Sequence, residues 1–493
     1  MSDLRQKAVR GAAWSTIENW AGQGMSFLVF LILARILGPA DFGLVALASV
    51  YVLVVQTLIR QGFAEAILQV KDLEDEHLDV AFWTNFAVSM LFGLFTVTAA
   101  PLVARFLGSE QLTQIIRALA LLFPLGAFSA VQQALLNRRL EFKALFYRTV
   151  ASFGCSGIVG ITMAMLHFGV WSLVGQQLTY AAVNAVVLWT AGGWRPKFRF
   201  SFPHLRRLWK FGVHISSMNL LDLVNKRTDQ YLVGHFLGTV ILGYYSVAVR
   251  VYNLMLSMGV SSLTRVAAGA FPRLQHEPER LVETLGKTVE LTTCLAFPAY
   301  LGFAAMAPEI VSVCFGPHWM PAVPAAQLLM IVGALDSVQL FHGQLLRSVG
   351  RPGLQFALLV MNMSVNIALY LIFVRHGLEA MVLAFVVRAY ALFPVELFVL
   401  KRVIPLRIWP YLRRILPQAV CSTAMLLLIN FGKTLNHGHL PNIVVLVLGV
   451  LFGAAFYATT MGIWRPDLRR QIFDFVSKFR QRRAAFDAAP AAS

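Results

Sequence analysis

The stretch ILGPADFGLVALAS (residues 36–49) recurs 200 residues later as FLGTVILGYYSVAV (236–249). The matched pairs are Leu37/Leu237, Gly38/Gly238, Gly43/Gly243 and Ala48/Ala248. The segments FGVWSLV (168–174) and HGLEAMV (376–382) form a second similar pair. Each precedes an apolar run that is even-numbered when the runs are counted from the N-terminus. Chance similarity between apolar helices is the alternative explanation, but shared glycine spacing at loop–helix junctions favours a true internal repeat.

The composition is that of a polytopic membrane protein. Of the 493 residues 58% are hydrophobic and 13% are charged, whereas soluble domains carry about 25% charged residues. Apolar runs of about 20 residues, enough for a helix to cross the hydrocarbon, recur along the whole chain. The four cysteines share no CxxC spacing and lie in or near apolar runs. We expect them to be buried small hydrophobic residues, with no metal or redox role.

The apolar runs predict fourteen transmembrane helices. They cover roughly 10–36, 40–62, 79–104, 112–136, 145–167, 170–192, 209–233, 239–263, 289–314, 322–346, 353–374, 378–400, 413–431 and 442–463. Lysine and arginine accumulate in the cytoplasmic loops of membrane proteins. If the N-terminus is cytoplasmic, these fourteen helices leave few basic residues in the outer loops. Those few are Arg35, Arg105, Arg117, Arg375 and Lys433. Both termini are therefore predicted to be cytoplasmic.

The repeat predicts an all-α protein with two six-helix lobes and an additional helix pair. The predicted parts are an N-terminal lobe (1–192), a basic cytoplasmic linker (193–208), a C-terminal lobe (209–402), helices 13 and 14 (403–463) and a basic amphipathic tail (464–493). Because each repeat has an even number of spans, the lobes run parallel about an axis along the membrane normal. The linker interleaves aromatic and basic residues, but its cytoplasmic position next to anionic lipid explains this better than nucleic acid does.

Charged residues interrupt the seventh span, LLDLVNKRTDQYLVGHFLG (220–238). Helical rotation puts Asn219, Asp222, Asn225, Lys226 and Asp229 on one third of the helix, with Arg227 off this stripe. Each charge at the bilayer centre costs about 2.5–3.5 kcal/mol, so the stripe must face water or protein. Pairing of the lysine with the two aspartates as a packing clasp is the alternative, and the spacing allows it.

Two further mid-span cations, Arg250 and Arg388, have no acidic residue within one turn of their own helices. On this count the C-terminal lobe holds four mid-membrane cations against two acids, which suits an anionic cargo. The predicted cationic substrate cavity contains Lys226, Arg250, Arg388, Arg227 and Arg60. Candidates for gating or for binding a coupling H⁺ or Na⁺ are Asp222, Asp229 and Glu18, and the predicted polar lining is Asn19, Asn219 and Asn225.

The sequence lacks motifs for nucleotide binding, metal binding or catalysis. LGKT (285–288) and FGKT (431–434) lack the first glycine of a phosphate-binding loop. No cluster has metal-ligand spacing. No predicted outer loop is long enough to hold a catalytic domain. We therefore expect a secondary transporter without cofactors rather than an enzyme.

Several segments together resemble a known family over roughly residues 1–400. They are LARILGPADFGLVALA (33–48), HLDVAFWTN (77–85), LLNRRLEFKAL (135–145), HFGVWSLVGQQL (167–178), WRPKFRFS (194–201), DQYLVGHFLGTVILGYYSVAVRV (229–251) and GPHWMPAVPAAQLL (316–329). The chain resembles the Wzx-type polysaccharide flippases of the MOP exporter superfamily, in the branch of colanic-acid and other exopolysaccharide exporters. The family has no catalytic motif, so no functional residue is carried over from it.

The resemblance implies the cargo of the protein and its cellular location. The cargo would be an oligosaccharide repeat unit on undecaprenyl diphosphate, moved from the inner to the outer leaflet of the bacterial plasma membrane for exopolysaccharide, O-antigen or capsule assembly. Membrane lipids, a polysaccharide polymerase and a chain-length regulator are the implied partners. Alternating access between the lobes is the expected mechanism. A MATE-type drug exporter and a lipid II flippase remain as alternatives, and a polysaccharide polymerase or O-antigen ligase is the alternative from a different class.

Overall fold

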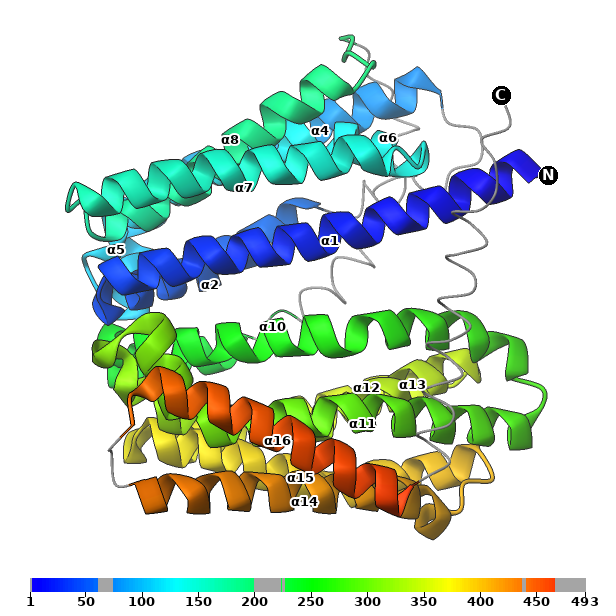
Figure 1. Cartoon of the computed structure of the whole chain (residues 1–493). Coiled ribbons are helices and arrows are strands. Elements are labelled where there is room, and N and C mark those ends of the chain that lie inside the picture. Colours follow the sequence, from blue (N-terminus) through cyan, green and yellow to red (C-terminus); the bar gives the residue numbers. More distant parts are fainter. Residues whose placement is uncertain (1, 61–73, 199–222, 224–226, 437–439, 466–493) are drawn as a thin grey trace, which may run out of the picture. The chain divides into compact units, whose positions relative to one another are not determined.

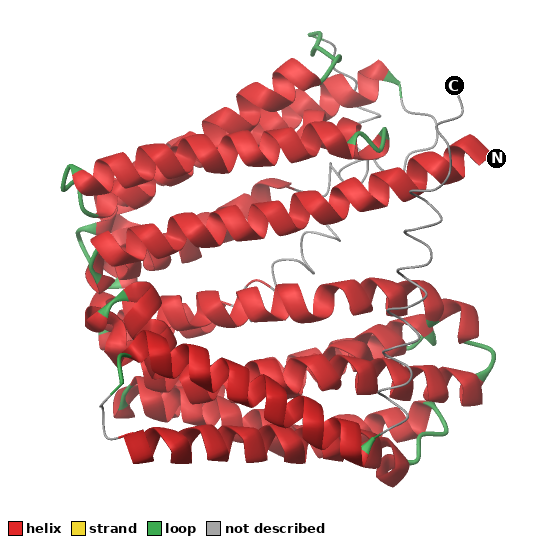
Figure 2. Cartoon of the chain, in the orientation of Figure 1, coloured by secondary structure: helices red, strands yellow, loops and turns green. Residues whose placement is uncertain are grey.

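The computed structural model describes residues 2–60, 74–198, 223, 227–436 and 440–465. Within these ranges every regular element is a helix and no strand occurs (Figure 2). The predicted all-α class is therefore confirmed.

Long helices follow one another with short connections (Figure 1). The first are α1 (Ser2–Ile36), α2 (Pro39–Arg60), α4 (Asp75–Leu107), α5 (Leu112–Leu119), α6 (Leu122–Arg138), α7 (Phe142–Met165) and α8 (Val170–Ala191). After a described helix at 227–237 come α10 (Thr239–Ala270), α11 (Pro278–Ile310), α12 (Val323–Ser348), α13 (Pro352–Phe373), α14 (Leu378–Val403), α15 (Ile408–Asn436) and α16 (Asn442–Trp464). Apart from the seventh, the predicted spans fall on described helices. The fourth (112–136) is divided between α5 and α6, and the ninth (289–314) runs from α11 into the π-helix Val311–Phe315.

Twelve candidate membrane spans occur among the described residues, by length and hydropathy. Helix α8 is long enough but is not one of them, and it carries the polar residues Gln176, Gln177 and Asn184. Most of the predicted seventh span lies outside the described residues. The protein is thus a multi-pass helical membrane protein, while the number fourteen stays a prediction.

The chain divides into two compact units. Unit 1 comprises Met1–Arg250, Cys314–Ala322 and Met363–Ala384, and unit 2 comprises Val251–Val313, Val323–Asn362 and Phe385–Ser493. The predicted division into lobes, linker, helix pair and tail stays a prediction. Most of the linker and nearly all of the tail lie outside the described residues.

In unit 1, α7 packs against both α1 and α8. Glycines let these helices approach closely, as small residues do in membrane helices generally. A β-carbon added at Gly157 would lie 2.6 Å from the side chain of Val29, and one at Gly160 would lie 3.0 Å from Gln176. The spacing of small residues on α7 therefore fixes how α1 and α8 lie beside it.

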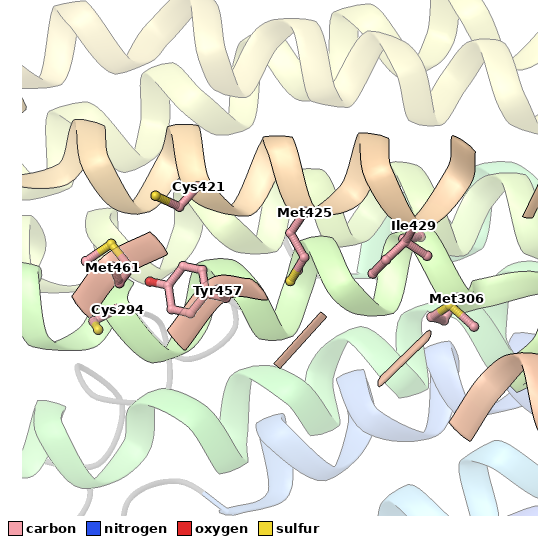
Figure 3. Close-up of a cluster of buried hydrophobic side chains, with 8 residues drawn as sticks. Cys294, Met306, Cys421, Met425, Ile429, Tyr457 and Met461 are labelled. Carbon is pink, nitrogen blue, oxygen red and sulfur yellow. The ribbon is translucent and has the colours of Figure 1, made fainter. Parts of the chain in front are cut away.

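In unit 2, α11 packs against α12, α15 and α16. A sulfur-rich cluster joins α11, α15 and α16 (Figure 3). Its labelled members are Cys294, Met306, Cys421, Met425, Ile429, Tyr457 and Met461. All four cysteines of the chain are free, with Cys294 and Cys421 buried as predicted. Cys155 is exposed, so the burial predicted for it was wrong.

The two glycines of the sequence repeat meet in unit 1. A β-carbon on Gly43 of α2 would lie 1.7 Å from the carbonyl oxygen of Thr239 on α10. Conversely, a β-carbon on Gly243 would lie 1.9 Å from the carbonyl oxygen of Pro39 on α2. Thr239 is 200 residues after Pro39, so the contact is reciprocal, as a two-fold relation between the repeats requires.

Two loops of unit 1 make a second reciprocal pair of contacts. The loop glycine Gly108, at φ 86°, packs against His235 at the end of the 227–237 helix. The loop after Gly316, at φ 104°, packs against the end of α1, where the Trp319 indole donates a 2.7 Å hydrogen bond to the carbonyl oxygen of Ala34. Both glycines adopt the left-handed conformation that side chains disfavour. These junctions bring α1, α2 and the first part of α10 together.

Candidate functional site

Part of the predicted cavity lies outside the described residues. This applies to Asn219, Asp222, Asn225 and Lys226. Arg60 is the last residue of α2, and its side chain is also outside the description. The choice between an Asp222–Lys226 clasp and a cargo site is therefore still open.

Arg227 and Asp229 are both held by neighbours in unit 1. The Asp229 carboxylate accepts a 2.6 Å hydrogen bond from the Tyr245 hydroxyl of α10 and a 2.7 Å bond from the backbone N–H of Gln230. Arg227 donates a 2.9 Å hydrogen bond to the side-chain oxygen of Gln230. Asp229 therefore fastens the 227–237 helix to α10, and its gating or ion-coupling role stays a prediction.

Arg250 projects from α10 toward α1. Its guanidinium donates a hydrogen bond to the Ser26 hydroxyl and lies 5.5 Å from the centre of the Phe30 ring. It is exposed and within electrostatic range of Arg227. At 1.5 Å per residue, Arg250 is about 16 Å from the start of α10. Two predicted cavity cations thus lie near one another at mid-span depth.

Glu18 is paired with a cation of another helix, and its gating or ion-coupling role stays a prediction. Its carboxylate forms a 2.7 Å ion pair with Arg148 of α7 and accepts a 3.1 Å hydrogen bond from Thr149. Only 17% of the Glu18 side chain and 10% of the Arg148 side chain are exposed. Asn19, the next residue, is exposed. Sequence reasoning missed Arg148, although its position inside the predicted span 145–167 was a usable signal.

Arg388 belongs to a different polar cluster, in unit 2. It donates a 2.9 Å hydrogen bond to the side chain of Asn362 on α13 and lies 4.7 Å from the centre of the Phe385 ring. Its field reaches Asp336 of α12, which accepts a hydrogen bond from the Tyr252 hydroxyl. The expected excess of four cations over two acids omitted Asp336 and other carboxylates in these helices, so that count was wrong.

Unit 2 also contains an apolar groove of about 760 Å³. It lies along α11, α15 and α16, and side chains of the cluster in Figure 3 line it, among them Met306, Met425 and Tyr457. Arg465, also part of the lining, forms an ion pair with Glu290. Among the described residues no three His, Cys, Asp or Glu side chains are arranged to bind a metal ion.

The comparisons with known proteins agree with one another. Residues 32–324, more than half of the chain, match the family model described as "Polysaccharide biosynthesis protein". The succinoglycan biosynthesis transport protein ExoT of Rhizobium meliloti (strain 1021) is 26% identical over 483 residues, which cover 97% of each chain. The lipopolysaccharide biosynthesis protein WzxC of Escherichia coli (strain K12) is 26% identical over 72% of each chain.

Among solved structures, the lipid II flippase MurJ in an inward closed conformation has a similar fold. The TM-score is 0.76 at 14% sequence identity, with 92% of this chain and 99% of that chain covered. At this identity the likeness shows the fold alone. The relatives are transport proteins rather than enzymes. The chain therefore belongs to the polysaccharide biosynthesis protein family, as a Wzx-like membrane transporter.

Proposed function

We propose that the protein moves an oligosaccharide linked to undecaprenyl diphosphate from the cytoplasmic to the outer leaflet of the bacterial inner membrane. The two repeats alternate in giving access to the cavity, and both termini lie in the cytoplasm. The reciprocal contact of Gly43 and Gly243 supports this arrangement, because alternating access needs two pseudo-equivalent halves that can separate and meet.

The observation that carries the proposal is the placement of Arg250. A guanidinium at mid-span depth is costly unless it is paired or serves a pathway. Here its bonded partner is the neutral hydroxyl of Ser26, and its charged neighbour Arg227 is a second cation. A diphosphate would meet both with charge-assisted hydrogen bonds, which are about twice as strong as neutral ones.

The apolar groove of unit 2 supports a lipid-linked cargo. Its volume of about 760 Å³ and its methionine-rich walls suit a flexible hydrocarbon chain, since methionine side chains adapt to irregular shapes. A drug exporter would need no such largely apolar groove. The isoprenoid tail can thus remain in hydrocarbon while the diphosphate and sugars cross.

The test is flipping in proteoliposomes. Fluorescent undecaprenyl-diphosphate oligosaccharide is placed in both leaflets, and its accessibility to an external quencher is followed over time. We expect rapid exchange with wild type, a loss of about tenfold or more with Arg250→Ala, and partial retention with Arg250→Lys. Arg375→Ala is the matched control, because Arg375 also lies over an aromatic ring, that of Phe236, but near the end of a span.

Each outcome bears on the proposal. If wild type exchanges lipid II but not the lipid-linked oligosaccharide, the result would favour a lipid II flippase, whose cargo carries the same diphosphate. Exchange that is equally fast in Arg250→Ala and Arg375→Ala would remove Arg250 from the cargo path. If wild type exchanges no lipid-linked sugar under any ion gradient, the proposed function is wrong.

A further inference from the structure

A small pocket lies in unit 2 where α14 ends and α11 and α15 begin. Its volume is about 320 Å³, at the lower end of the range of ordinary ligand pockets. One wall comes from the first turns of α11, between Glu279 and Gly286. The other comes from residues 405–414, which lead from the α14–α15 connection into α15. The function proposed above makes no use of this pocket.

Three charged side chains line the pocket without neutralising one another. They are Glu279, Arg407 and Arg414. Within the described parts of the chain, none of the three forms a salt bridge. Glu283 is within electrostatic range of Arg414, but its carboxylate pairs with Lys287 at 2.7 Å. The pocket therefore offers two positive groups and one negative group to a ligand.

A glycine on the opposite wall makes room for Arg414. A β-carbon added at Gly286 would overlap Nη1 of Arg414 and would lie 3.1 Å from its Cζ atom. Any side chain at position 286 would thus push the guanidinium aside, whereas glycine lets it lie directly against α11. The Arg414 side chain is half-buried. A charged group that is already held in place loses less conformational entropy when it binds a ligand.

The pocket lies at the level of the membrane surface. Helix α11 has 33 residues and is about 50 Å long, whereas the hydrocarbon core is about 30 Å thick. Four of its first ten residues, 278–287, are charged, so the surplus length is at the pocket end. Trp409 lies between the lining residues Arg407 and Pro410 and is 66% exposed, and tryptophan is enriched at membrane–water interfaces. A lipid headgroup is therefore within reach of the pocket.

We propose that the pocket binds the headgroup of a phosphatidylethanolamine molecule from the surrounding bilayer. The phosphate accepts charge-assisted hydrogen bonds from the guanidinium groups of Arg407 and Arg414. The ammonium group donates to the Glu279 carboxylate. An anionic headgroup such as phosphatidylglycerol meets the same arginines but has no cation for Glu279. This lipid is separate from the cargo, so the inference does not rest on the proposed transport function.

The test is a lipid competition with the delipidated full-length protein, read by native mass spectrometry. The protein in detergent receives equal amounts of dioleoyl phosphatidylethanolamine and dioleoyl phosphatidylglycerol, and the bound lipids are counted. We expect wild type to retain the ethanolamine lipid in preference. Glu279→Gln should lower this retention up to about fivefold, as for the loss of an exposed ion pair, without lowering retention of the glycerol lipid. Glu277→Gln is the control, because Glu277 is exposed and pairs with Arg280.

The arginines are tested in the same competition. Arg407→Gln should weaken retention of both lipids about tenfold, because a hydrogen bond between two charged groups is lost. Gly286→Ala should also weaken both, although every charge remains, because it displaces the Arg414 guanidinium. Arg413→Gln is the control for both variants, since Arg413 is exposed and lies next to Arg414 without lining the pocket.

Three outcomes would overturn the proposal. If Glu279→Gln keeps the same preference as Glu277→Gln, the pocket does not recognise the ammonium group. If Arg407→Gln and Gly286→Ala retain both lipids as well as Arg413→Gln does, the headgroup binds elsewhere. If soluble phosphoethanolamine binds wild type as tightly as the lipid does, the occupant is a soluble phosphate ester rather than a lipid. None of these results depends on whether lipid-linked oligosaccharide is exchanged.

Discussion

Helices α2 and α10 begin alike and then differ. Their first turns carry Gly43 and Gly243, and each glycine lies against the backbone of the other helix. Seven residues further along, α10 carries the exposed Arg250, whereas α2 carries Val50. Backbone packing across a two-fold relation needs small residues on both sides, so both glycines are kept. Under the proposed function, a charge that binds the cargo is needed in one repeat only.

The same difference recurs one turn earlier. Tyr245 of α10 donates its hydroxyl proton to Asp229. The residues 200 positions earlier are Val45 and Val29, which are both buried. The repeat therefore uses polar pairs in its second copy where the first copy has apolar side chains. Departures from the repeat point to function more sharply than the repeat itself does.

The largest effect is expected at the glycine junction. Gly43→Ala and Gly243→Ala should each lower the free energy of unfolding by about 3 kcal/mol, because a β-carbon would overlap a carbonyl oxygen of the other helix. Thermal unfolding in detergent measures this. Gly24→Ala on α1 is the control, since its β-carbon would meet nothing within 4 Å. Unequal losses in the two glycine variants would break the comparison between α2 and α10.

A smaller effect is expected at Tyr245. Tyr245→Phe should cost about 1–2 kcal/mol of stability, because the Asp229 carboxylate loses a hydrogen-bond donor. The double variant Asp229→Val/Tyr245→Val copies the first repeat and should recover most of that loss. The same unfolding experiment, arranged as a double-mutant cycle, measures the coupling. Strictly additive losses would mean that the two side chains do not act as a pair.

Arg250 should matter little for stability. Arg250→Val, which copies Val50, is expected to change the unfolding free energy by no more than about 0.5 kcal/mol, as at other exposed positions. The same variant should lose lipid exchange in the proteoliposome assay. A protein that unfolds when Arg250 is replaced would show that the arginine is a packing residue, and the contrast with Val50 would lose its functional meaning.

The smallest effect is expected from moving the charge. Adding Val50→Arg to Arg250→Val should restore no measurable lipid exchange. The neighbouring cation Arg227 has Phe27 as its counterpart in the first repeat, so a charge on α2 would act alone. The exchange rate of the double variant, compared with Arg250→Val, decides this. Recovery toward the wild-type rate would show that either repeat can hold the cargo.

Much of the fold was predictable because it depends on local patterns. Helix periodicity, apolar length and glycine spacing act over a few turns, and they placed the described spans on helices. Helix ends were less accurate, since α11 begins at Pro278 although its span was predicted to begin at 289. Helix α8 also formed where predicted, although it is not among the twelve candidate spans. The glycine spacing also indicated the repeat, whose reciprocal contact is visible in unit 1.

The polar interior was less predictable because its partners are far apart in the sequence. Arg148 pairs with Glu18 across 130 residues, and Tyr411 meets His342 across 69 residues. A helix presents each charge at a known depth and angle, but the sequence does not say which other helix lies opposite. Counting charges along single helices therefore overlooked Asp336 and the partners of Glu18 and Asp229 on other helices.

The sequence by itself determined that this chain is a helical membrane transporter with a repeated plan, because bilayer thickness and positive-charge bias act on each segment separately. Only the tertiary structure decided which charges meet an opposite charge on another helix, as Glu18 does, and which meet a neutral side chain there, as Arg250 meets Ser26. The reason is that the cost of a buried charge depends on its neighbours in space rather than on its neighbours in the chain.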